Sequence, residues 1–432
     1  MPAKAGKFSL IPGNRSVSGR NGFRVNGVGF NPDIVIVMSV GLGVENAWNT
    51  TPNIWGCMSL WSNNTVGAAQ ANTGVNEFWG TDYRPSSFWS NSGVIWFKNS
   101  HGGGGSAIFI GGTHDDGFDI GYPDGGYEGG YGIICYYLAL SGDGEVGQIY
   151  AYPGAPTPVT VGFEPSIYMS LGSGGLSGGA GDIAFVDFSV PSWGFGGYEN
   201  VGNPGGGSPE WMANGLAHSE TVEQVRFFVD GEGGQNIFDG YTAAQIIGNS
   251  AYDFGRSDTS VSYVITDGFP AGTNTRTSLH FMSEALYTGA GITPGSVGVP
   301  LEVDVGFSPD CVIFLGPQTN HGNLFGVPWG GRCFGFLTED FQCCIAWGAY
   351  QHANSDPSLA KVASFCSSDI GWISNFTDTA LDNPGSPNYG VADLLPSGFE
   401  ITTSAMPKAN APMRYVAYGF DEGRSQFFEV LD

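Results

Sequence analysis

The chain contains one strand–turn–strand pattern three times. The copies are "VNGVGFNPDIVIVMSV" (25–40), "VTVGFEPSIYMSLG" (159–172) and "VDVGFSPDCVIFLG" (303–316). In each copy a short alternating run meets a Gly-Phe pair, turns at a proline and continues as an apolar run. Glycine permits the bend, the ring is buried at it, and proline, which has no amide hydrogen, suits a turn or strand start. The copies share no reactive residue, so the pattern predicts architecture rather than chemistry.

Three further features follow each copy in the same order: an aromatic–Gly pair, a second Gly-Phe turn and a closing apolar strand. They are Trp55-Gly56, Trp193-Gly194 and Phe334-Gly335; "DDGFDIG" at Phe118, "TDGFPAG" at Phe269 and "PSGFEITT" at Phe399; and the strands 131–140, 278–286 and 413–420. We therefore divide the chain into modules 1–145, 146–284 and 285–432, each of ordinary domain size. The shared structural residues are Gly29, Phe30 and Pro32; Gly162, Phe163 and Pro165; and Gly306, Phe307 and Pro309.

Composition predicts an all-β protein with little helix. Glycine takes 71 of 432 positions and charged residues only 13%, and no long apolar stripe has helical spacing. Short β-branched and aromatic runs separated by Gly and Pro are typical of strands and turns. The apolar fraction of 41% is enough for packed cores. About eight to ten strands per module fit a two-sheet β-sandwich, most simply a jelly roll, so we expect three such modules in tandem.

Net charge, apolar runs and cysteine usage limit the partners and the cellular compartment that we expect. A net charge of −25 opposes phosphate backbones, so we expect no nucleic-acid partner. No apolar run approaches the length of a membrane span, and residues 1–20 lack the apolar core of a signal peptide. The 7 cysteines are odd in number and form no C-x-x-C pair. This favours buried free thiols in a chain folded in a reducing cytoplasm over disulfides or zinc.

The motifs resemble a known family. "ALYTGAG", "VDVGFSPDCVIF", "SGFEITT" and "MRYVAYGF" in the third module, with "GVGFNPDIVIVMS" and "DDGFDIG" in the first, resemble a module common in phage virion proteins. Such modules occur in tail-fibre and other particle-surface proteins, often with a lectin-like jelly-roll fold. The middle module departs from the pattern, since Glu164-Pro165-Ser166 lacks the Asp and its closing strand is degenerate. The family's basic residue after the apolar strand and its "fDs.RG"-like segment are absent.

The resemblance implies a virion surface, with assembly in the host cytoplasm. We therefore expect a non-enzymatic structural protein, either a tail- or fibre-associated adhesin or a capsid decoration (cement) protein. Its expected partners are other virion proteins, a host-surface glycan and further copies of itself, a trimer among them. The alternative, from a different class, is a carbohydrate-binding or glycoside-cleaving protein. That alternative predicts convergent carboxylates in a concave site and a secretory signal.

One candidate binding segment is rich in aromatic residues. "NEFWGTDYRPSSFWSNSGVIWF" (76–97) carries Trp79, Tyr83, Trp89 and Trp96. These rings would stack on sugars, bury against a neighbouring subunit, or form a satellite core under a long loop.

One candidate cation site is acidic. Asp115, Asp116 and Asp119 lie close together in "THDDGFDIG", where they would hold a structural Ca²⁺ or form a solvated turn. No other cofactor is expected. Ser177 in "GLSGG" matches G-x-S-x-G but lies in a Gly/Ser run without a following helix pattern, which predicts a flexible loop. The 6 histidines have no ligand spacing, so no catalytic residue is assigned.

Overall fold

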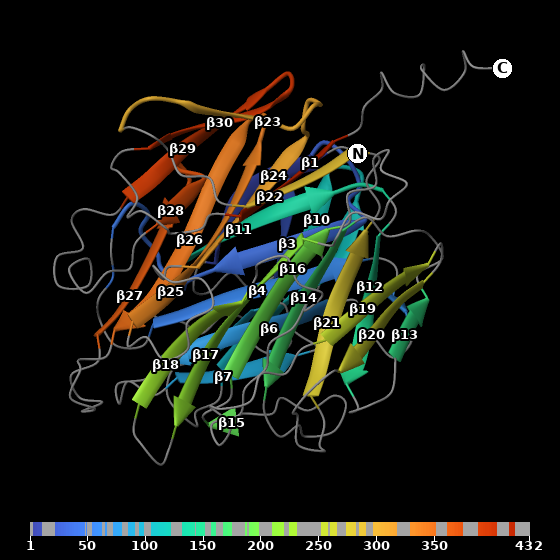
Figure 1. Cartoon of the computed structure of the whole chain (residues 1–432), viewed down its shortest axis with the longest axis vertical. Coiled ribbons are helices and arrows are strands. Elements are labelled where there is room, and N and C mark those ends of the chain that lie inside the picture. The colour runs from blue at the N-terminus through green and yellow to red at the C-terminus, as the bar shows by residue number, and fades with distance from the viewer. Residues whose placement is uncertain are drawn as a thin grey trace.

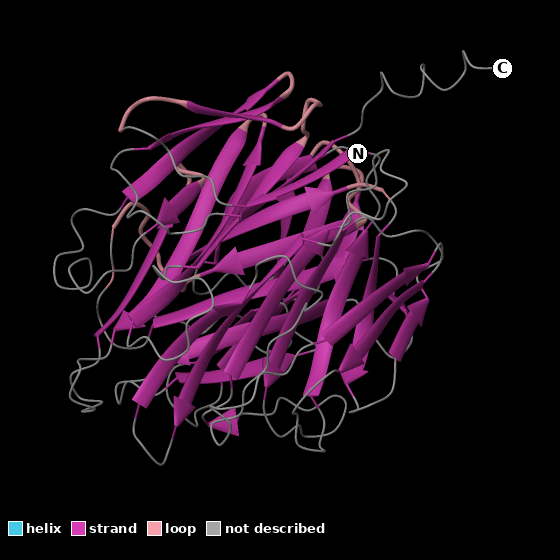
Figure 2. Cartoon of the chain, viewed as in Figure 1, coloured by secondary structure: helices cyan, strands magenta, loops and turns pink. Residues whose placement is uncertain are grey.

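A computed structural model describes part of the chain. The described backbone comprises residues 3–10, 22–47, 49, 54–62, 65–66, 72–79, 85–90, 95–98, 105–121, 132–142, 144–151, 157–160, 167–174, 186–187, 190–197, 210–219, 224–230, 252–257, 260–265, 274–281, 285–290, 297–317, 329–350, 361–374, 388–403 and 414–419. Side-chain surroundings are described for 3–10, 22–47, 49, 58–62, 108–121, 132–142, 297–314, 333–347, 364–372, 390–403, 415, 417 and 419. Every regular element in these ranges is a strand (Figure 2), so the predicted all-β class is confirmed.

The strands fall into three consecutive sets. The first set is β1 (Ala3–Leu10), β2 (Gly22–Asn26), β3 (Ile34–Ser39), β4 (Ile54–Ser62), β6 (Asn72–Trp79), β7 (Pro85–Ser90), β8 (Ile95–Lys98), β9 (Gly105–His114), β10 (Gly117–Gly121) and β11 (Ile133–Leu140). The second is β12 (Gly144–Ala151), β13 (Thr157–Thr160), β14 (Ile167–Gly174), β16 (Val190–Gly197), β17 (Glu210–Ser219), β18 (Gln224–Asp230), β19 (Tyr252–Ser257), β20 (Ser260–Ile265) and β21 (Asn274–Phe281). The third is β22 (Ala285–Ala290), β23 (Leu301–Asp304), β24 (Cys311–Pro317), β25 (Trp329–Thr338), β26 (Phe341–Tyr350), β27 (Lys361–Ser367), β28 (Trp372–Ser374), β29 (Asn388–Leu395), β30 (Gly398–Thr403) and β31 (Arg414–Gly419). Two short strands, β5 (Thr65–Val66) and β15 (Val186–Asp187), pair with a neighbouring set.

Each set forms a large and a small antiparallel sheet with the same strand order. The first set has β1-β11-β3-β4-β6-β7 and β2-β10-β9-β8, and the third has β22-β31-β24-β25-β26-β27 and β23-β30-β29-β28. The second has β12-β21-β14-β16-β17-β18 and β13-β20-β19, with no strand that matches β8 among its described residues. One set gives way to the next at 141–143 and 282–284, close to the predicted module limits. The division into three domains itself stays a prediction.

Each described core lies between a large and a small sheet. In the first set Phe8, Val35 and Tyr137 of the large sheet pack with Ile110 and Phe118 of the small one. In the third set Phe314 and Tyr415 of the large sheet lie edge-on to Phe399 of the small one, with ring centroids 5.6 and 4.8 Å away. Rings crossed in this way bury large areas with a favourable edge-to-face geometry. Both sets are therefore two-layer sandwiches.

The large sheets of the first and third sets are buried on their second face as well. Val35 and Val37 of β3 face the first core, while Ile34, Ile36 and Met38 point the other way, and all five are 0% exposed. Since strand side chains alternate between faces, a sheet with one wet face would leave alternate residues exposed. The third set repeats this, because Phe334, Phe336 and Trp347 are buried outside its core cluster. In β24, Val312 and Phe314 face the third core while Cys311 and Ile313 point the other way, and all four are 0% exposed.

The three large sheets contact one another in a cycle. Strand β4 lies against β27 of the third set, β16 lies against β7 of the first, and β25 lies against β18 of the second. Likewise β1 lies against β25, β12 against β4, and β22 against β16. Each set thus uses its first and fourth strands to contact the set before it, and the first set contacts the third. In Figure 1 most of the third set (orange to red) lies at upper left and most of the second (green to yellow) at lower right.

Candidate functional site

The repeated Gly-Phe-x-Pro motif forms the turn between the second and third strands of a set. Gly29 and Gly306 have φ values of +86° and +79°, in the left-handed region where a side chain is unfavourable. Phe30 packs against the first core and Phe307 belongs to the third. Pro32 and Pro309 are buried where β3 and β24 are about to begin. In the second set, Gly162, Phe163 and Pro165 lie outside the described residues.

The second Gly-Phe turn, which precedes β10 and β30, binds the backbone of the Gly-Phe-x-Pro turn. The Val28 amide donates to the Asp116 carbonyl oxygen at 3.1 Å, and the Val305 amide donates to the Ser397 carbonyl oxygen at 2.8 Å. Val28 and Val305 each come directly before the Gly-Phe pair of their motif, so the first and third sets make the same backbone contact. It joins the two turns of each sandwich.

In both sets a carboxylate accepts a hydrogen bond from the amide of the motif glycine, but the carboxylate comes from a different position in each set. In the first set the Asp116 carboxylate accepts from the amides of Gly29 at 2.9 Å and Gly27 at 3.1 Å. In the third set serine stands in the place of Asp116, and the Asp304 carboxylate accepts from the Gly306 amide at 2.9 Å. The bonds from Gly29 and Gly27 lower the pKa of the exposed Asp116 carboxyl, because they favour its ionised form.

The three aspartates predicted to bind calcium have the following surroundings. Asp116 binds the two glycine amides, while Asp119 forms an ion pair with Arg24 at 3.0 Å across adjacent strands. Asp115 is exposed at the tip of the hairpin, and the ring nitrogen Nδ1 of His114 accepts the Asp116 amide at 3.3 Å. Within the described ranges no three His, Cys, Asp or Glu side chains converge as a metal site would require. A Ca²⁺ site at these residues stays a prediction.

The aromatic segment 76–97 is mostly strand, so its interpretation as a long loop is wrong. Trp79 ends β6, Trp89 lies in β7 opposite Val75, and Trp96 lies in β8 opposite Ala107. Aromatic residues alternating with small polar ones favour strands. Tyr83, and the side chains of the three tryptophans, lie outside the described part of the chain. Their predicted role in binding is therefore open.

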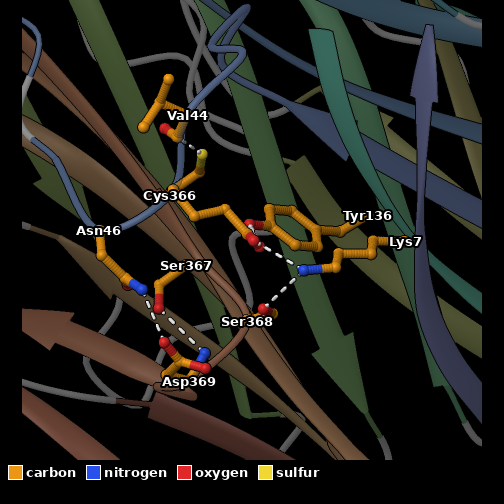
Figure 3. Close-up of polar contacts among 9 residues, drawn as sticks. Lys7, Val44, Asn46, Tyr136, Cys366, Ser367, Ser368 and Asp369 are labelled. Carbon is orange, nitrogen blue, oxygen red and sulfur yellow. Dashed lines mark hydrogen bonds and ion pairs between the residues drawn. The ribbon is translucent and has the colours of Figure 1, made fainter.

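The densest described group of polar contacts joins the first set to the third, and sequence reasoning missed it. The Lys7 ammonium donates to Glu45 at 2.6 Å and to the Ser368 hydroxyl at 3.0 Å, and the Tyr136 hydroxyl donates to Glu45 at 2.6 Å (Figure 3). The Asn46 side-chain amide donates to Asp369 at 2.6 Å. We call these residues, with the backbone segments that carry them, the closing junction.

Backbone pairing supports the closing junction. The Asn46 amide donates to the Cys366 carbonyl at 2.9 Å, and Asn49 and Ser364 exchange two bonds of 2.9 Å as an antiparallel bridge. The segment after β3 thereby adds to the outer edge of β27. A covered edge no longer offers unpaired amides and carbonyls to other chains.

The surroundings of Glu45 and Tyr136 in the closing junction favour one protonation state for each. Burial raises the pKa of the Glu45 carboxyl, but hydrogen bonds from Lys7, Tyr136 and Ser368 outweigh it, so the net pKa lies below the ordinary value. Burial first, then nearby Cys366 and Glu45, raises the pKa of Tyr136 far above its ordinary range. At neutral pH, Glu45 is therefore ionised, and Tyr136 keeps its proton while donating a hydrogen bond to it.

The cysteines whose side chains are described lie inside the protein. Cys135, Cys311, Cys333, Cys343, Cys344 and Cys366 are buried thiols, and none of these six is in a disulfide. Burial raises the pKa of the Cys366 thiol to about 12, although the hydrogen bond with Tyr136 lowers it in part. Since the thiolate is the reactive form, the Cys366 thiol is held in its less reactive form. The predicted buried free thiols are confirmed for these six, while the side chain of Cys57 lies outside the described residues.

Comparisons of the chain with protein families, with curated proteins and with solved structures found no match. Within the part of the chain that the structure describes, no helix has the length and apolar character to cross a membrane. Ser177 lies outside the described residues.

Proposed function

We propose that the protein is a non-enzymatic structural component of a phage particle surface. It is either a tail- or fibre-associated adhesin or a capsid decoration protein, built from jelly-roll-like sandwiches in tandem. It acts by burying surface against virion proteins or a host-surface glycan. The observation that carries this proposal is the use of the repeated motif. Wherever the motif is described, its glycines, rings and prolines shape turns and fill cores, and its carboxylates bind backbone amides.

The closing junction supports the proposal in a second way. Its carboxylate accepts hydrogen bonds from both the ammonium and the phenol, and the neighbouring Cys366 thiol stays protonated. The surface charge adds to this, because a net charge of −25 keeps a protein soluble at the high local concentration of a repeating assembly.

The test is to locate the chain in purified particles. Mass spectrometry of particles banded by density, followed by particle imaging with an antibody against the chain, gives its presence and its position. Label over the capsid supports decoration, and label at the tail supports the adhesin. Absence of the chain from intact particles contradicts the proposal.

A carbohydrate-binding or carbohydrate-active protein is the second candidate. It is favoured by the placement of Trp79 and Trp89 on two paired strands, β6 and β7. Tryptophan rings are flat platforms of the kind that sugars stack on. Purified protein incubated with host cell-wall glycans separates the candidates. Released sugars contradict the non-enzymatic assignment, whereas retention on a glycan array without turnover supports the adhesin.

A further inference from the structure

The first and third sets meet through two different surfaces, one on each set. One surface is the second face of β1, β11, β3 and β4, whose cross-strand row Ala5, Leu138, Ile36 and Leu60 is 1% exposed or less. The other is the second face of β25, β26 and β27, with the row Phe334, Ile345 and Cys366 at 2% or less. Strands β1 and β4 lie against this second surface. The contact is therefore heterologous, since unlike patches meet.

A heterologous contact either closes into a ring or continues as an open filament. Here it closes after three sets. The same strand pairs meet between the second set and the first, the third and the second, and the first and the third. The last of these joins segments more than three hundred residues apart in sequence, as in the Asn49–Ser364 bridge.

The same edge pairing also occurs twice in the described part of the chain. After β14, the segment β15 pairs with β7 through Val186 opposite Ser87 and Asp187 opposite Ser86. After β3, Asn49 pairs with Ser364 of β27. Strand β14 occupies the place of β3 in its set, and β7 the place of β27. One device thus joins neighbouring sets and also the first set to the last.

Polar contacts fix the register of the first-to-last contact. Lys4 forms an ion pair with Asp340 at 2.7 Å, and Lys7 reaches Ser368 at 3.0 Å. Together with the Asn46–Asp369 bond, they cross the boundary at three separate points. Apolar faces alone allow sliding, whereas hydrogen-bonded partners at several points define one arrangement.

We propose that these two surfaces form a docking interface whose partner is another copy of the same module, and that one chain supplies all three copies. The protein is then a closed pseudo-trimer in a single chain and is monomeric in solution. The trimer expected from the sequence is then formed by the three modules of one chain. No second chain is needed to cover the described second faces of the large sheets, and none has access to them. This inference goes beyond the proposed function and does not depend on it.

The test is a disulfide between the first and third sets in the full chain. Asn49 and Ser364 exchange both backbone bonds, and residues paired in this way have Cα atoms about 5.5 Å apart, which suits a disulfide. The variant Asn49→Cys/Ser364→Cys is oxidised mildly, and peptide mass spectrometry locates the disulfide. Light scattering after gel filtration gives the mass. The matched control is Asn49→Cys/Val391→Cys, since Val391 lies on the exposed face of a small sheet. The unsubstituted chain controls for native thiols.

The proposal predicts a disulfide between positions 49 and 364 within one chain and a mass of 45.4 kDa that does not change with protein concentration. The control pair forms no bond. Disulfide-linked species of two or three chains would overturn the proposal, because the two surfaces would then join separate molecules. A single-chain mass without the bond would overturn it equally, since the first and third sets would not meet.

Discussion

Replacing Ile36 by alanine tests whether the large sheet is buried on its second face. Ile36 lies in β3, is 0% exposed, and points away from the first core. Its cross-strand neighbours are Leu138 in β11 and Leu60 in β4, both also 0% exposed. In an isolated two-layer sandwich this row would face water. In the closed arrangement it faces another set.

The expected loss follows from the groups removed. Ile→Ala deletes about three carbons, and at about 0.8 kcal/mol each the lost transfer free energy is about 2.4 kcal/mol. The cavity that remains raises the loss in unfolding free energy to about 3 to 4 kcal/mol. A solvent-facing position would lose only about 0.5 kcal/mol or less.

Guanidinium chloride unfolding, followed by tryptophan fluorescence and far-UV circular dichroism, measures the loss. Val37→Ala is the core-facing control in the same strand, with an expected loss of about 2 kcal/mol. Val391→Ala, on a side chain 37% exposed, is the surface control, with an expected loss of about 0.5 kcal/mol or less. If Ile36→Ala costs no more than Val391→Ala while Val37→Ala costs its full amount, the packing of the second faces is wrong.

Three further predictions use the same unfolding assay or a thiol titration. Gly398→Ala lowers the unfolding free energy by about 3 kcal/mol or more, because the added Cβ would lie 1.9 Å from the Val303 carbonyl oxygen. The control Gly27→Ala has open space around the added Cβ but a φ of +87°, so it loses only about 1 kcal/mol. Equal losses for the two variants would contradict this. Glu45→Gln loses about 1 kcal/mol at pH 7. Because the folded pKa of Glu45 is lowered, its contribution is full above the unfolded pKa and is lost as pH falls through the folded pKa, so the variant and the parent converge in acid; a difference that persists there argues against this role. At pH 8 a thiol reagent labels at most one of the 7 cysteines of the folded protein, namely Cys57, and it labels all of them in denaturant. Labelling of Cys366 before unfolding would show that the closing junction is open.

Local features of the fold were predictable from the sequence because short-range chemistry determines them. The left-handed turns at Gly29 and Gly306 follow from Gly-Phe-x-Pro, and the two-sided burial of β3 and β24 follows from their unbroken apolar runs. The recurrence of the motifs predicted a repeated strand order. The aromatic segment 76–97 was expected to belong to a loop, although the Trp and Phe residues in it favour strands.

Contacts between the sets were not predictable in the same way. An unbroken apolar run shows that both faces are covered, but not by which partner. Glu45 lies in "GLGVEN", a segment that resembles any polar turn, and its partners Lys7 and Tyr136 are 38 and 91 residues away. The carboxylate at Asp304 takes over the role of Asp116 from another strand, so counting matched positions missed their equivalence. Such pairings depend on the assembled chain.

Zero-length crosslinking of the unmodified protein tests the closed ring most directly. Lys4 and Asp340 are 336 residues apart in sequence, yet their Nζ and Oδ2 atoms lie 2.7 Å apart at the surface between the first and third sets. A carbodiimide joins an ammonium to a carboxylate only when they touch. With an equal mixture of ¹⁴N- and ¹⁵N-labelled protein, the account predicts a Lys4–Asp340 peptide in which both halves carry the same isotope. A mixed-isotope peptide, or none while the Lys7–Glu45 pair within the first set crosslinks, would contradict it.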